Sequence, residues 1–178
     1  MDLGLVDRIT ADAIGEPGMR TFYLQARTPE QLFTVIVEKE QVELLARSVL
    51  ELLADVADET VAIEIGDEEQ TLENPVEPRW RTGRLSIGFD ADQDRFLLEL
   101  EEYSPELEEG DEDDPRSPPA EETESITLWA SRAQMLALAR HGEAVVSHGR
   151  PRCQFCGNPM DPEGHTCPAT NGHRKPRT

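Results

Sequence analysis

The sequence has no long apolar run, few aromatic residues and only three cysteines. A membrane-spanning helix needs about 20 predominantly apolar residues, and no stretch of the 178-residue chain approaches that length. The first residues lack the positive start and apolar core of a secretory signal, so we expect a cytoplasmic protein with no membrane partner. An odd number of cysteines does not make a disulfide framework.

Positive charge is also scarce. The chain contains 17 Lys and Arg residues against 37 Asp and Glu residues, which gives a formal net charge of −20. Such a surface repels the phosphate backbone of a nucleic acid and the headgroups of an anionic membrane. Nucleic acid is therefore not an expected partner of the body of the protein.

The negative charge is concentrated in one segment. Residues 104–124 contain ten acidic residues, one arginine and four prolines. A segment that repels itself and has few apolar side chains does not offset the entropy lost on ordering, so we expect a disordered acidic insert. Residues 149–178 have the opposite balance, with five basic and two acidic residues. The argument against nucleic acid is therefore weaker for this basic tail.

The hydrophobic pattern of the first third of the chain predicts three strands and a helix. Residues 7–14 and 20–27 are strand-like and flank a Gly-Glu-Pro-Gly turn, which suits a hairpin. Residues 32–37 are rich in β-branched side chains, which favour a third strand. From Lys39 to about Val56, apolar residues recur at helical spacing.

Residues 84–147 repeat this plan, with strands at 84–89, 95–101 and 125–130 and a helix that Ser131 caps. The two helices share a sequence pattern, in which Gln41-Val42…Leu45-Ala46-Arg47 matches Gln134-Met135…Leu138-Ala139-Arg140. We therefore predict an α+β body over residues 1–148. Its two β-β-β-α halves, about 5–57 and 80–147, form a mostly antiparallel sheet with the helices on one face.

The tail, residues 149–178, contains a small zinc-knuckle-like module. Its candidate ligands are thiols and an imidazole, the groups that zinc prefers in proteins: Cys153, Cys156, His165 and Cys167. Three thiolates and one imidazole complete a tetrahedron and leave no position for water, which indicates a structural zinc ion. His173 is a rival fourth ligand. A Cys-x-x-Cys redox pair and a catalytic cysteine are weaker alternatives, because neither a βαβ context nor a neighbouring base is evident.

Basic residues in the body suggest a second kind of site. Arg20, Arg81 and Arg84 lie in or beside predicted strands, where they could bind an anion at a sheet face. Pairing with neighbouring acidic residues is the more ordinary role of such arginines. We find no phosphate-cradling loop and no serine-nucleophile motif, so no catalytic residue is assigned.

Three segments together resemble an uncharacterised actinobacterial family, a domain of unknown function of the 3090 type. They are residues 15–26, the Glu38-Lys39-x-Gln41 helix start, and the closing Cys-x-x-Cys…His-x-Cys motif. The resemblance implies a cytoplasmic protein without established activity that occurs beside a histidine-phosphatase-like and a kinase-like protein. It also implies an aromatic residue where this chain has His173.

The sequence therefore favours a non-enzymatic, zinc-containing binding or adaptor protein that acts through a protein partner. One alternative is an enzyme or binder of a phosphorylated or nucleotide-like small molecule, which would use Arg20, Arg81 and Arg84. Another is nucleic-acid binding through the basic zinc tail, which predicts a steep dependence on salt.

Overall fold

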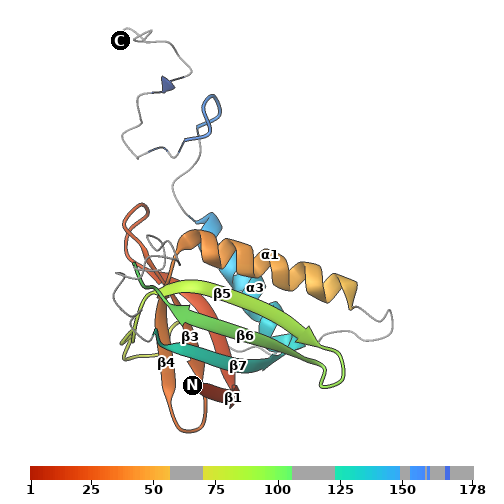
Figure 1. Cartoon of the computed structure of the whole chain (residues 1–178). Helices are drawn as coiled ribbons and strands as arrows, with labels where there is room; N and C mark the ends of the chain where they lie inside the picture. The colour runs from red at the N-terminus through yellow and green to blue at the C-terminus, as the bar shows by residue number, and fades with distance from the viewer. Residues whose placement is uncertain (57–69, 106–122, 149–152, 159, 161–166, 169–178) are drawn as a thin grey trace, which may run out of the picture.

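The computed structural model describes residues 1–56, 70–105, 123–148, 153–158, 160 and 167–168. Within these ranges the elements follow one another in the predicted order, preceded by a short strand that the sequence pattern did not indicate (Figure 1). They are β1 (Asp2–Leu5), β2 (Arg8–Ile14), β3 (Thr21–Arg27), β4 (Leu32–Val37), α1 (Lys39–Asp55), β5 (Thr82–Asp90), β6 (Arg95–Glu102), β7 (Ser125–Ser131) and α3 (Arg132–Ser147).

The strands form two sheets, so the single sheet predicted from the sequence is wrong. One sheet has the order β1-β7-β6-β5, and the other has the order β2-β3-β4. All pairs within the sheets are antiparallel except β1 with β7. Helix α3 contacts β2 of one sheet and β6 and β7 of the other, so it belongs to neither sheet alone.

The chain passes from one sheet to the other between β1 and β2. The N–H of Val6 donates to the carbonyl of Trp129 in β7 at 2.9 Å, whereas the N–H of Asp7 donates to that of Arg27 in β3 at 2.8 Å. Two successive residues thus pair with different sheets. A local strand pattern does not show such a crossing, because it depends on which distant strand each residue meets.

A second crossing leads into β5. The N–H of Arg79 donates to the carbonyl of Thr34 in β4 at 2.9 Å, and Arg81 pairs in parallel with Ile36. The carbonyl of Arg81 then accepts from the N–H of Tyr103, which follows β6, at 2.7 Å. At both crossings, therefore, the segment that enters one half pairs in parallel with the last strand of the other half.

The two halves also share their strand register. Phe22 is opposite Val37 in the β3–β4 pair, and Phe96 is opposite Ala130 in the β6–β7 pair. Phe22 and Phe96 are each the second residue of their strand, and both are buried. The short segment that begins each half pairs with the last strand of the other half. This exchange explains why the repeat produces two linked sheets.

A glutamine at the start of each helix holds one crossing. Gln134 Nε2 donates to the carbonyls of Val6 and Asp7 at 2.9 and 2.8 Å. The carbonyl oxygen of the same side chain accepts the N–H of Ser131, the N-cap of α3, at 2.8 Å. The first turn of α3 is thus bonded to the place where the chain changes sheets.

Gln41 of α1 does the same at the second crossing. Its Nε2 donates to the carbonyls of Thr82 and Gly83 at 3.3 and 3.1 Å, and its Oε1 accepts the N–H of Glu38 at 2.8 Å. The matching glutamines of the sequence repeat therefore have matching roles. Both complete the capping box of their helix and bind backbone carbonyls at a crossing.

Apolar side chains from both sheets and both helices form one core. Helices α1 and α3 pack on each other, and a Cβ added to Gly142 would lie 3.2 Å from Val42 Cγ1, so the helices approach closely there. The largest apolar residues that are almost completely buried are Phe33, Phe96, Ile9, Leu98, Leu100, Ile126, Leu128, Met135 and Leu138. Among the residues described, no helix has both the length and the apolar character needed to cross a membrane.

We predict that Gln134→Ala lowers the free energy of unfolding by about 1–3 kcal/mol, because two carbonyls and the N-cap N–H lose a partner. Gln41→Ala should cost less, since its bonds to the carbonyls are longer. Denaturant unfolding followed by circular dichroism measures both. Glu143→Ala, at an exposed position of α3, is the matched control. Equal stabilities for Gln134→Ala and Glu143→Ala would show that the glutamine does not hold the crossing.

Candidate functional site

Three cysteine thiols lie together near the C-terminal end of the described chain. The sulfurs of Cys153, Cys156 and Cys167 all lie within 4.8 Å of one another. The Cys153 and Cys167 sulfurs are 3.8 Å apart, whereas a disulfide bond is about 2.05 Å long. Two thiolates each about 2.3 Å from a tetrahedral zinc ion are about 3.8 Å apart. The cluster therefore has the spacing needed to hold a metal ion.

A tight turn presents the first two thiols. The N–H of Gly157 donates to the carbonyl of Cys153, and the N–H of Cys153 donates to that of Asn158, each at 2.8 Å. Gly157 has a φ of +74°, a left-handed conformation that favours glycine. The glycine after the second cysteine thus permits the turn that brings Cys156 back toward Cys153.

Backbone N–H groups in this turn act on the thiols. The N–H groups of Phe155 and Cys156 lower the pKa of Cys153, the former at 3.4 Å from its sulfur. The N–H of Asn158 acts in the same direction on Cys156, but burial and the neighbouring thiols raise the pKa of Cys156 overall. N–H donors that face a sulfur stabilise the thiolate, which is the form that binds metals.

The two histidines considered as a fourth ligand, His165 and His173, lie outside the described residues. Most of the predicted acidic insert, residues 106–122, and of the basic tail lie outside them as well. The structure therefore supports three thiols as a possible metal site. The choice of the fourth ligand remains a prediction from the sequence, as do the domain boundaries.

The arginines predicted to bind an anion have separate partners. Arg20 donates to the carbonyl of Val145 near the end of α3 at 3.1 Å. Arg81 forms an ion pair with Glu38, and Arg84 lies 3.9 Å from Glu101 across the β5–β6 pair. A pocket of about 480 Å³ takes in Arg81 but neither of the others. Its lining residues are Glu38, Gln41, Arg81, Thr82, Gly83 and Tyr103.

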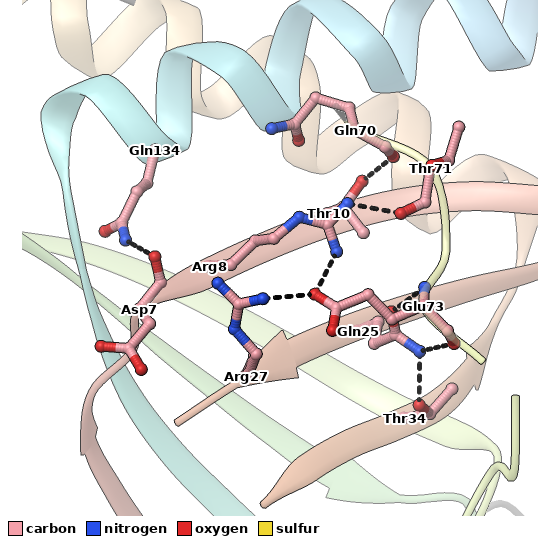
Figure 2. A network of polar contacts seen from close by, with 10 residues as sticks. All are labelled: Asp7, Arg8, Thr10, Gln25, Arg27, Thr34, Gln70, Thr71, Glu73 and Gln134. Carbon is pink, nitrogen blue, oxygen red and sulfur yellow. Dashed lines mark hydrogen bonds and ion pairs between the residues drawn. The ribbon is translucent and has the colours of Figure 1, made fainter. Parts of the chain in front are cut away.

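A polar layer that sequence reasoning missed covers one face of the β2-β3-β4 sheet (Figure 2). Thr10, Gln25 and Thr34 are almost fully buried there. Gln25 Nε2 donates to Thr34 Oγ1 and to the carbonyl of Glu73, each at 3.1 Å, and Gln25 Oε1 accepts the N–H of Glu73 at 2.8 Å. Thr10 donates to the carbonyl of Gln70. Residues 70–73 thus supply backbone partners to the buried polar side chains.

Two arginines of this layer share one carboxylate. Arg8 is only 6% exposed, and its Nη1 lies 3.0 Å from Glu73 Oε1. Arg27 Nη1 lies at the same distance from the same oxygen, while Arg8 also donates to the carbonyl of Thr71. Alternating strands predict that such polar residues face water. Arg8 and Glu73 are 65 positions apart, so no local pattern indicates that a distant segment covers them.

The structure thus defines an α+β protein of two linked sheets with a cysteine cluster able to hold a metal ion. A family model described as "Protein of unknown function (DUF3090)" matches residues 2–167, and the chain belongs to this family. The match runs from β1 to the third cysteine of the cluster. No curated protein matches the chain, and no solved structure matches it.

We predict that Arg8→Met lowers the free energy of unfolding by about 2–3 kcal/mol, because a buried, charge-assisted set of hydrogen bonds is lost. Arg84→Met is the matched control. Arg84 pairs with Glu101 at 3.9 Å, its side chain is 73% exposed, and surface pairs contribute about 0–1 kcal/mol. Urea unfolding of both variants measures the difference. Similar losses would show that burial of Arg8 contributes nothing beyond an ordinary surface pair.

Proposed function

We propose that the protein is a non-enzymatic, zinc-containing cytoplasmic adaptor, whose cysteine cluster presents the C-terminal region to a protein partner. The observation that supports this proposal most directly is the convergence of Cys153, Cys156 and Cys167 within 4.8 Å. The three sulfurs come from two separated stretches of chain. A metal ion would tie these stretches together.

Thiol donors favour zinc among the metals a protein commonly binds in a tetrahedral site. A nitrogen ligand from His165, or from its rival His173, would complete four coordination positions. A closed set of four protein ligands leaves no place for a water nucleophile, so the proposed ion is structural. For so short a segment, the free energy of metal binding would supply the free energy of folding.

An exposed aromatic side chain supports an adaptor role. Phe155 lies between the first two cysteines and is 76% exposed. Its backbone is held by the turn, and its N–H faces the sulfur of Cys153. An apolar ring on a metal-ordered turn can bind a partner with little further loss of conformational entropy. Aromatic residues are also enriched among those that dominate binding energy at protein interfaces.

The family resemblance suggests the first partners to test, which are the neighbouring histidine-phosphatase-like and kinase-like proteins. These partners are proposed from the resemblance alone. Phe155, the exposed aromatic residue, can be substituted without changing a proposed metal ligand. Metal binding and partner binding can therefore be tested independently.

For the metal, we expect purified protein to carry stoichiometric zinc, measured by inductively coupled plasma mass spectrometry. Cys153→Ser and Cys156→Ser should each lose most of it, because a tetrahedral site loses a thiolate. His165→Ala should lose zinc and His173→Ala should retain it. The reverse result would make His173 the fourth ligand. A folded, zinc-free protein whose three thiols all react freely with a thiol reagent would contradict the zinc site.

For the partner, we expect Phe155→Ala to keep its zinc and lose most of the complex with the phosphatase-like or the kinase-like protein. Cross-linking followed by native purification measures the complex, and metal analysis of the same sample confirms that the turn is intact. Met19→Ala is the matched control, because Met19 is apolar and 80% exposed in the β2–β3 turn. A complex that survives Phe155→Ala, or that neither candidate forms with the wild type, would contradict this adaptor surface.

A further inference from the structure

Thr82, at the second crossing, has a buried hydroxyl group that its surroundings do not explain. The residue is only 2% exposed, and its Oγ1 has no hydrogen-bond partner in the part of the chain that the structure describes. A buried hydroxyl that makes no hydrogen bond keeps the cost of its lost hydration. Packing alone would favour valine, which has nearly the same shape and no polar group.

The repeat places valine at the equivalent position of the first crossing. Gln134 donates to the carbonyl of Val6 there, as Gln41 donates to the carbonyl of Thr82 at the second crossing. Val6 is also 2% exposed. One half of the protein thus fills this position with an apolar side chain, and the other half fills it with an unpartnered hydroxyl. The fold accepts valine here, so packing does not account for the hydroxyl.

Thr82 lines the pocket of about 480 Å³, a volume that suits a small ligand. Among the described lining residues it is the one that is buried, whereas the others are exposed or half-buried. The N–H of Tyr103 donates to the carbonyl of Arg81 at 2.7 Å. A Cβ added to Gly83 would lie 2.9 Å from Tyr103 Cα, so the glycine lets the two backbones approach. Thr82 therefore lies at the base of a pocket whose walls are fixed by backbone contacts.

The described lining carries one cation and one anion. Arg81 forms an ion pair with Glu38, and the two side chains are 56% and 52% exposed. A pair this exposed contributes little to stability, so a ligand with a charge for each partner can replace it at small cost. A simple anion would face the Glu38 carboxylate and the field of a protein with a formal net charge of −20. Tyr103, which is 42% exposed, adds an aromatic wall.

We propose that this pocket binds a free α-amino acid with an aromatic side chain. Arg81 binds the carboxylate of the ligand, Glu38 binds its ammonium group, and the ligand ring packs on Tyr103. Once the exposed Arg81 side chain turns to the ligand, the Thr82 hydroxyl donates to the same carboxylate. The site shares no residue with the cysteine cluster and does not rest on the proposed adaptor function.

Isothermal titration calorimetry of the full-length protein with L-phenylalanine tests this site. Phenethylamine lacks the carboxylate and 3-phenylpropionate lacks the ammonium group, so each should bind at least about tenfold more weakly. Thr82→Val should lose at least about tenfold in affinity, because a hydrogen bond to a charged group is lost. Arg81→Gln should lose at least as much. Thr127→Val is the matched control, since it makes the same change at a half-buried position of β7 outside the described lining.

Urea unfolding without ligand separates binding from a structural role. Thr82→Val should be at least as stable as wild type, because it removes an unpartnered hydroxyl. A clear loss of stability would show that the hydroxyl has a structural partner and would overturn the inference. It would also be overturned by wild type that does not bind L-phenylalanine, by equal affinity for 3-phenylpropionate, or by unchanged affinity in either folded variant. Arg81→Gln alters an exposed side chain and keeps the test valid if Thr82→Val does not fold.

Discussion

The architecture depends on satisfying backbone carbonyls where the chain leaves one sheet for the other. At each crossing one side-chain amide, Gln134 or Gln41, donates to two consecutive carbonyls. One bond of each pair is part-buried, where a carbonyl without a partner is costly. Because each glutamine also completes the capping box of its helix, one side chain connects the start of the helix to the crossing. Both places where the chain changes sheets are therefore bonded to the start of a helix.

Local patterns predicted much of the fold and little of its assembly. β4 begins and ends at the predicted residues, and both helices follow the apolar spacing of the sequence, because strand and helix periods are local properties. The crossings were not predictable in the same way. Val6 and Trp129 are far apart in the chain, and no alternation of polar and apolar residues specifies which distant strand a residue will pair with.

In the candidate sites, too, the local features were predictable from the sequence and the tertiary contacts were not. Cys153, Cys156 and Cys167 were found from spacing because thiols two residues apart suit one metal ion. The polar layer was missed because its arginines alternate with apolar residues as solvent-facing residues do. What buries Arg8 is a backbone segment from another part of the chain, and burial of that kind depends on tertiary structure.

The two halves differ in what covers their equivalent faces, and this difference decides which arginine is buried. Arg84 and Glu101 neutralise each other on an exposed strand pair, whereas Arg8 and Arg27 require an anion that their own strands do not supply. Removing one partner from a partly buried ion cluster is destabilising, because the remaining groups keep their desolvation cost. The contact of Arg8 with Glu73 therefore ties residues 70–73 to the β2-β3-β4 sheet, a role that the exposed Arg84–Glu101 pair does not have.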